Sequence, residues 1–200
     1  MPKNPKPKLV LGSASPRRKQ LIAQLGIEAE VVEACRINET PEPGEAPRAY
    51  VRRMALAKAT LISKKHKGAI VLAADTTVAV GKRILGKPRS RAEAEQFLKL
   101  LSGRRHRVYS AVAIIGGAPK PSVKISTSRV GFKRLTSGEI SWYLESGEWR
   151  GKAGGYAIQG KAGAFIKSLA GSYSGVVGLP LYETACLLNA HGFDLLTDNK

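Results

Sequence analysis

The chain has 200 residues, 43% of them hydrophobic, which suits one α/β domain or two small lobes that share a cleft. No apolar run is long enough to span a bilayer. The polar N-terminus is not followed by the apolar h-region of a secretory signal, so we expect a cytoplasmic protein with no membrane segment. The formal charge of +18 favours an anionic partner. The two cysteines have neither metal-ligand spacing nor a disulfide pattern.

Apolar periodicity, caps and glycines predict strands that alternate with helices. Ser15 suits a helix N-cap and Pro16 the first helical position, while Thr136 and Glu139 form a capping box. The apolar run that ends at Asp75 is typical of a central buried strand. In chain order we expect a strand at 9–12, a helix from 16 to about 26, a loop at 38–47, a helix at 47–63, a strand at 69–74, a hairpin at 77–85, a helix after Ser90, strands near 108–114 and 124–133, a helix that ends at Gly147, and a last helix from Pro180.

Arg17 and Arg18 oppose the usual charge preference at the start of a helix. The helix dipole favours acidic residues there, so each arginine costs about 0.3–1 kcal/mol. A helix N-terminus after a Ser- and Gly-containing loop is also a ready anion site, and guanidinium groups match phosphate oxygens. The pair therefore predicts either a phosphate clamp or a basic surface turn.

Asp75 is the first candidate for chemistry, because open α/β sheets place their sites where buried strands end. The alternative is that it caps a turn through Thr76 or Thr77. Glu39, in the proline-rich loop, is a possible second carboxylate. Two carboxylates among several cations predict Mg²⁺ or Mn²⁺ bound to a polyphosphate, since magnesium uses few carboxylates and completes its shell with substrate oxygens.

Three further positions carry both a functional and a plain structural interpretation. Lys58 shares a helix face with Met54 and Ile62, where it either serves a site or reaches past the apolar stripe to solvent. Lys87 lies in a turn that the following proline stiffens, where it either serves a site or is a lysine in solvent. Gln159 lies in the glycine-rich segment 151–160. This segment either binds a ligand, since glycines let backbone approach a ligand closely, or is a flexible surface loop.

The remaining classes of site receive little support. The three histidines are dispersed, and we expect His106 to be structural or at the surface. The sequence contains no Walker A loop, no dinucleotide-binding fingerprint and no nucleophile elbow.

The same segments, in the same order, resemble the Maf family of nucleoside triphosphate pyrophosphatases over about residues 8–193. The resemblance implies an elongated α/β fold similar to inosine triphosphate pyrophosphatase, with a mixed, bent sheet flanked by helices around a central cationic cleft. It further implies a flexible tail at residues 1–8 and a single domain at 9–196, with two lobes around the cleft. The matching segments are SASPRR at 13–18, NETP at 38–41, PGE at 43–45, ADT at 74–76, GKP at 86–88, SG at 102–103 with His106 and Val108, KAGGYAIQG at 152–160, GSY at 171–173, and VVGLPL at 176–181.

The resemblance also implies an activity, the conversion of a nucleoside triphosphate and water to the monophosphate and pyrophosphate. Asp75 matches the family's proton acceptor, and Glu39 matches a second acidic position that helps to hold a divalent metal. The positions that match substrate-binding positions are Ser13, Arg17, Arg18, Lys58, Thr76, Lys87 and Gln159. A homodimer is implied by the family alone.

Three of these positions, Arg17, Thr76 and Gln159, resemble the branch of the family that acts on dTTP and UTP. CTP and modified pyrimidine triphosphates are related candidates, and the other branch acts on 7-methyl-GTP. A glutamine amide can pair with the acceptor-and-donor edge of uracil or thymine, whereas the two donors of guanine suit a carboxylate better.

A rival from another class is a nucleic-acid-binding or division-regulating protein that uses its basic surface. The sequence offers no recognition helix, and only 6% of its residues are aromatic, which leaves few platforms for base stacking. We therefore expect a nucleoside triphosphate rather than a nucleic acid as the main partner.

Overall fold

The structure is a computed structural model that describes residues 7–193 and 195. Most of the predicted tail at 1–8, and the predicted domain boundary at 196, lie outside the described residues. The helices and strands are β1 Leu9–Gly12, α1 Pro16–Ala23, β2 Val31–Val32, α2 Pro47–Ser63, β3 Ile70–Val80, β4 Arg83–Leu85, α3 Arg91–Leu101, β5 Arg105–Ile115, β6 Ser122–Phe132, α4 Ser137–Glu145, the 3₁₀ helices η1 Ala153–Gly155 and η2 Lys161–Phe165, β7 Ile166–Ala170, α5 Tyr173–Val177 and α6 Leu181–Ala190.

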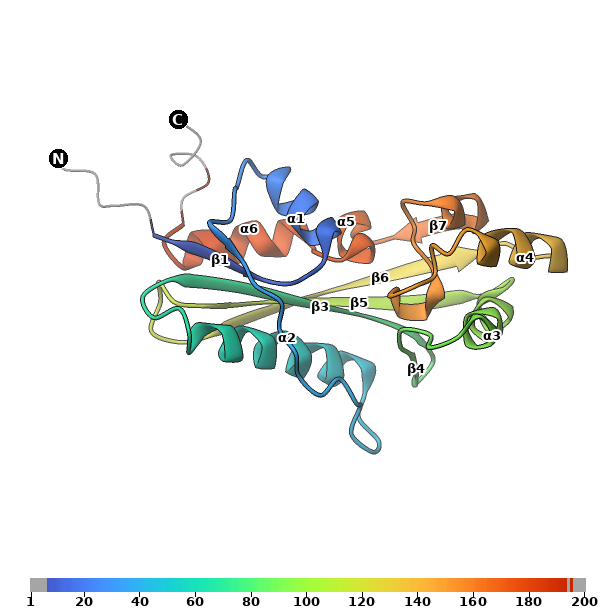
Figure 1. Cartoon of the computed structure of the whole chain (residues 1–200), viewed down its shortest axis with the longest axis horizontal. Helices are drawn as coiled ribbons and strands as arrows, with labels where there is room; N and C mark the ends of the chain where they lie inside the picture. Colours follow the sequence, from blue (N-terminus) through green and yellow to red (C-terminus); the bar gives the residue numbers. More distant parts are fainter. Residues whose placement is uncertain (1–6, 194, 196–200) are drawn as a thin grey trace.

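The strands form one mixed sheet in the order β2-β1-β3-β5-β6-β7, and β4 pairs separately with β3. β1 runs parallel to both β2 and β3, while the remaining pairs are antiparallel. The long strands β3, β5 and β6 follow the long axis of an elongated molecule (Figure 1). The α/β class and the mixed sheet are confirmed.

Helices cover both faces of the sheet. α2 lies on one face, where its Ala55 and Ala59 pack against Ala73, Ala111 and Ala113 of β3 and β5. These small residues allow the helix to approach the sheet closely. α1, α5 and α6 lie on the opposite face, and α3 and α4 lie at the far end of the molecule (Figure 1). Among residues 7–193 and 195, no helix is long and apolar enough to cross a membrane.

The prediction that the strand ends at Asp75 is wrong. β3 continues to Val80, and Asp75 lies in its middle, paired with Ala111 of β5. The apolar run stops at this point, but backbone pairing with β5 does not depend on apolar side chains and continues. The predicted hairpin is confirmed, and Gly81 adopts the positive φ of 60° that its turn requires.

Most helix boundaries follow from their caps. Thr136 and Glu139 form the full capping box at α4. At α3 the side chain of the N-cap Ser90 accepts from the N–H of Glu93, but Glu93 accepts from the N–H of Arg89 rather than that of Ser90, so only half of a capping box forms. The short elements β2, β7 and α5 were not predicted, since segments of two to five residues show too little periodicity.

Candidate active site

One edge of β3 is open where the polar residues of this strand begin. β1 pairs with β3 only as far as Gly12 opposite Ala73, and β4 pairs with it only from Val78 onward. Residues 74–77 therefore lack a strand neighbour on this edge, although their other edge stays paired with β5. The polar side chain of Asp75 lies at this gap in the sheet.

A cavity of about 680 Å³ lies at the gap, a volume suited to a small-molecule ligand. The loop after β1, the proline-rich loop, α2, the loop after β4 and the glycine-rich segment all reach it. Every residue that the sequence analysis proposed for the site lines the cavity, namely Ser13, Arg17, Arg18, Glu39, Lys58, Asp75, Thr76, Lys87 and Gln159.

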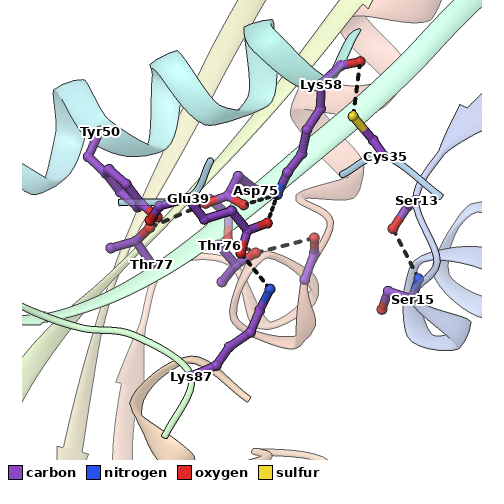
Figure 2. A network of polar contacts seen from close by, with 12 residues as sticks. Ser13, Ser15, Cys35, Glu39, Tyr50, Lys58, Asp75, Thr76, Thr77 and Lys87 are labelled. Atoms are coloured by element: carbon purple, nitrogen blue, oxygen red, sulfur yellow. Dashed lines mark hydrogen bonds and ion pairs between the residues drawn. The ribbon is translucent and has the colours of Figure 1, made fainter. Parts of the chain in front are cut away.

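Two lysines and two carboxylates form a continuous chain across the cavity (Figure 2). The ammonium of Lys58 lies 2.6 Å from Oδ1 of Asp75 and 2.7 Å from Oε1 of Glu39. The ammonium of Lys87 lies 2.7 Å from Oε2 of the same glutamate. Each carboxylate is therefore neutralised locally, and a cation lies beside each acid.

Glu39 is held as a carboxylate at this position. Burial raises its pKa, but hydrogen bonds from Lys58 and Lys87 outweigh that effect and lower the pKa of Glu39 to about 2. The hydroxyl of Tyr50 donates to the backbone carbonyl of Glu39 over 2.8 Å, which ties the proline-rich loop to α2. Both oxygens of the side chain are engaged by ammonium groups.

The structure also decides two of the alternatives that the sequence left open. Lys58 does not extend to solvent, because it is only 6% exposed and points from α2 towards the sheet. Asp75 does not cap a turn, since it lies within a regular strand. Its Oδ2 has only a long contact of 3.4 Å, from the hydroxyl of Thr77, and so retains acceptor capacity.

Arg18 lines the cavity and contacts three other residues of its lining. Its guanidinium donates to the carbonyl of Gly178 at 2.8 Å, to Oγ of Ser13 at 3.3 Å and to Oγ1 of Thr76 at 3.5 Å. Ser110 donates to the same Thr76 oxygen at 3.0 Å. Burial lowers the pKa of Arg18, and the charge of Asp75 partly opposes this effect. These contacts use part of the five N–H donors of a guanidinium.

Arg17 differs from Arg18 because its Nε is buried without a hydrogen-bond partner among the described residues. Burial also lowers the pKa of this guanidinium. A buried, unpaired donor costs about 1–3 kcal/mol, and a ligand oxygen in the cavity would relieve that cost.

The glycine-rich segment around Gln159 is fixed rather than flexible. The N–H of Ala157 donates to the hydroxyl of Tyr143 at 3.1 Å, and the hydroxyl of Tyr156 lies 2.7 Å from Nε2 of the buried His106. Gly154 has φ of 69°, and a Cβ there would lie 2.9 Å from a methyl carbon of Val78. The flexible-loop alternative is therefore excluded, and of the two places expected for His106 the structure shows the buried one rather than the surface.

Sequence reasoning missed part of the lining, including Cys35, Glu148, Arg150, Lys152 and Tyr156. Burial lowers the pKa of Lys152, and the neighbouring Arg17 lowers it further. Burial raises the pKa of the Cys35 thiol, which argues against a nucleophilic cysteine. The cluster of cations and glycines at 150–155 was a usable signal, whereas nothing in the sequence placed Cys35 beside Lys58.

The comparisons with known proteins agree with one another over nearly the whole chain. The family model "Maf-like protein" matches residues 8–191. A protein of Zymomonas mobilis named dTTP/UTP pyrophosphatase is 54% identical over 94% of this chain and 93% of its own length. Proteins of the same name from Bradyrhizobium diazoefficiens and Caulobacter vibrioides are 50% and 51% identical, over 95% and 94% of this chain and 94% and 97% of their own lengths.

Solved structures give a more distant likeness. A nucleoside-triphosphatase / dITP/XTP pyrophosphatase from Mycobacterium abscessus matches with a TM-score of 0.41 and 21% identity, over 64% of this chain and 76% of that chain. A likeness of this degree does not place the chain within that protein's fold.

Proposed function

The chain belongs to the Maf family, and from this premise we propose that it hydrolyses dTTP and UTP to the nucleoside monophosphate and pyrophosphate. The names of three relatives at 50% identity or more support this substrate pair. The observation that carries the proposal is the position of Lys58, which contacts both Asp75 and Glu39 inside the cavity. Asp75, the proposed proton acceptor, therefore lies in one cluster with a cation that is proposed to bind phosphate.

In the proposed reaction, Asp75 accepts a proton from a water molecule that attacks the α-phosphorus. A new bond forms between the water oxygen and phosphorus, and the bridging bond between the α- and β-phosphates breaks. Pyrophosphate leaves with the electron pair of that bond. The open Oδ2 of Asp75 suits the acceptor, while Lys58 holds Oδ1 and so orients the carboxylate.

Lys58, Lys87 and Arg18 are proposed to bind the phosphates and to stabilise the charge that develops on the departing pyrophosphate. Ser13 lies beside Arg18, which donates to its hydroxyl, and it is proposed to contact the phosphates as well. In the free protein both lysines are paired with Glu39. We infer that they exchange this carboxylate for phosphate oxygens when the substrate enters.

A divalent cation fits the donor set, although no three His, Cys, Asp or Glu side chains gather within the described part of the chain. Mg²⁺ is commonly held by one or two carboxylates together with substrate phosphates. Asp75 offers a free oxygen, and Glu39 would offer its own once the lysines move to the phosphates. When bound, Mg²⁺ or Mn²⁺ would polarise phosphate oxygens as a Lewis acid.

Arg17, Thr76 and Gln159 are proposed to select the base. Arg17 supplies the buried donor that lacks a partner, which suits a carbonyl oxygen of uracil or thymine. Gln159 supplies an amide that can both donate and accept. The same residues provide no second acceptor for the donor edge of a guanine, so 7-methyl-GTP is the weaker candidate.

The domain organisation is proposed on the same basis. Residues 9–196 would act as one catalytic domain with two lobes around the cleft, in the manner of inosine triphosphate pyrophosphatase, and the protein would be a homodimer. Analytical ultracentrifugation of the full chain tests the dimer directly.

Pyrophosphate release from UTP, dTTP and 7-methyl-GTP, measured with Mg²⁺ and with a chelator, tests the proposed activity. We expect release from the two pyrimidine triphosphates and its loss in the chelator. Asp75→Asn should lower kcat by about 10²- to 10⁴-fold while the chain stays folded, although its thermal stability should fall because the buried Lys58 loses one of its two carboxylates. Full activity of this variant would overturn the role of Asp75, and preferred hydrolysis of 7-methyl-GTP would overturn the substrate.

A further inference from the structure

A group of arginines lies on the α2 side of the sheet, outside the cavity. Arg107 of β5 lies directly opposite Arg129 of β6, and Arg105 precedes Arg107 by two residues. Side chains two residues apart on a strand, or directly opposite on neighbouring strands, project from the same face. All three are exposed, whereas the intervening His106 and Val108 are buried on the other face.

This part of the sheet lies beyond the start of α2. The guanidinium of Arg48, in the first turn of that helix, donates to Oγ1 of Thr127 at 3.4 Å, which marks where the helix begins over β6. Arg129 follows Thr127 by two residues and so lies past that point. Figure 1 shows that α2 runs along only part of the long strands. Gly131, opposite Arg105, adds no side chain to the face, and the small side chain of Ser168 on β7 lies over this position.

The charges on this face are not compensated by the protein. None of Arg48, Arg105, Arg107 and Arg129 forms an ion pair with any residue in the described part of the chain. Like charges directly opposite each other on neighbouring strands are destabilising. Folding therefore gains nothing electrostatic from the pair of Arg107 and Arg129, and an anion from outside would remove their repulsion.

We propose that these four residues, the arginine face, bind the phosphate backbone of a single-stranded nucleic acid. Guanidinium groups pair with phosphate oxygens in bidentate fashion. Along the paired strands β5 and β6, the face extends from the position of Arg105 to that of Thr127, four residues or about 14 Å. This is the length of a few phosphates on one nucleic-acid strand. A flexible single strand can follow this short, twisted surface. Because every nucleotide carries the same phosphate, contacts confined to the phosphates make the binding independent of base sequence.

A protein partner fits this face less well. Protein interfaces depend on buried apolar or aromatic anchors. The large hydrophobic side chains that are exposed in the described residues lie elsewhere, on β2, α4, α5 and α6. The sequence argued against nucleic acid because it lacks a recognition helix and stacking platforms, but backbone binding through arginines needs neither.

The test measures the anisotropy of a labelled single-stranded oligonucleotide of mixed sequence as salt is varied. Each phosphate contact contributes about −0.7 to the slope of log K against log salt, so four contacts predict a slope of about −3. The double variant Arg107→Ala/Arg129→Ala should lower the slope to about half of that and weaken binding at least about tenfold at low salt. The matched control, Lys64→Ala/Lys67→Ala, removes the same charge from exposed positions at the far end of α2 and should leave the slope unchanged.

Several outcomes would overturn the arginine face as a binding site. An equal loss of affinity in both double variants would show that only net charge matters. Displacement of the oligonucleotide by UTP would place it in the cavity instead, and equal affinity for a poly-glutamate peptide would assign the face to acidic proteins. UTP hydrolysis is measured in parallel and should be unchanged in both variants, so failure of the proposed activity and failure of this proposal are distinguishable.

Discussion

The side chain of Lys58 is shared by two carboxylates, and this single contact links the proposed chemistry to the proposed substrate binding. A lysine placed between Met54 and Ile62 on the buried stripe of α2 is costly unless it is paired. The carboxylates of Asp75 and Glu39 provide that pairing. The same contact orients Asp75, the proposed proton acceptor, and holds the ammonium of Lys58 where it could bind a phosphate. The pairing that offsets the cost of burying Lys58 therefore also serves the proposed function.

Glu39→Gln separates the two proposed roles of Glu39, which are to pair with Lys58 and Lys87 and to help to hold a divalent metal. In this variant the ion pairs of Lys58 and Lys87 with residue 39 no longer compete with phosphate. Pyrophosphate should therefore bind about two- to fivefold more tightly in the presence of a chelator. That range corresponds to an ion pair of about 0.4–1 kcal/mol in a partly exposed position. Hydrolysis with Mg²⁺ should fall, and the Mg²⁺ concentration for half-maximal activity should rise.

Calorimetry of pyrophosphate binding and a Mg²⁺ titration of activity measure these effects. Glu42→Gln is the matched control, because Glu42 is in the same loop but pairs with the exposed side of Arg53. Weaker pyrophosphate binding by Glu39→Gln than by the parent protein would contradict the proposed exchange of lysines.

Among the elements, the segment 153–160 shows how buried aromatic residues set the position of a polar one. Tyr143 of α4 accepts from the N–H of Ala157, and Tyr156 contacts His106 of β5. The rings of His106, Phe132 and Tyr156 meet edge to face with centroids 5.0 to 5.4 Å apart. Gln159 thus projects from a segment that is anchored on two sides.

Tyr143→Phe should loosen this segment without removing any group that lines the cavity. The N–H of Ala157 would lose its acceptor in a buried position, at a cost of about 1–3 kcal/mol. We expect KM for UTP to rise several-fold and kcat to change little, because Asp75 and Lys58 are held by other elements. Tyr182→Phe, at an exposed position on α6, is the control. A fall in kcat at constant KM would contradict this assignment.

The sequence predicted the elements whose signals are local, and it missed what depends on pairing between distant segments. The boundaries of α2 follow from Pro47 and its apolar stripe, and they are those of the structure. The position of Asp75 within a strand, by contrast, depends on pairing with Ala111. The gap between β1 and β4, where the cavity lies, depends on the register of the strands, which no single segment encodes. All proposed site residues met at the cavity because the family resemblance carried information on their joint position.

At the scale of the whole molecule, the high positive charge includes two separate groups of cations. Lys58, Lys87, Arg17 and Arg18 converge on the cavity, whereas the arginine face lies at the sheet surface. One small anionic substrate at the cavity leaves the other group uncompensated. The two groups therefore predict different salt responses, a modest one for hydrolysis and a steep one for the binding of a nucleic acid strand.

The dependence of global stability on pH should report the buried His106. Burial lowers its pKa from the ordinary 6.5 to about 4 in the folded chain, so the unfolded state binds a proton first as the pH falls. Stability is therefore present in full above pH 6.5 and is lost as the pH falls from 6.5 towards 4. One such proton changes the free energy of unfolding by at most about 3–4 kcal/mol over this range.

Denaturant unfolding of the parent protein and of His106→Gln, at several pH values between 7 and 4, measures this contribution. The variant should be less stable at pH 7, because it disturbs the contact with Tyr156, but its stability should fall less steeply with decreasing pH. Glu39 acts in the same direction at lower pH, since its stabilisation is lost only as the pH falls from 4.5 towards its folded pKa of about 2. The two groups therefore titrate in adjoining ranges, and a slope between pH 6.5 and 4.5 that is equal in both proteins would show that His106 is not the group responsible.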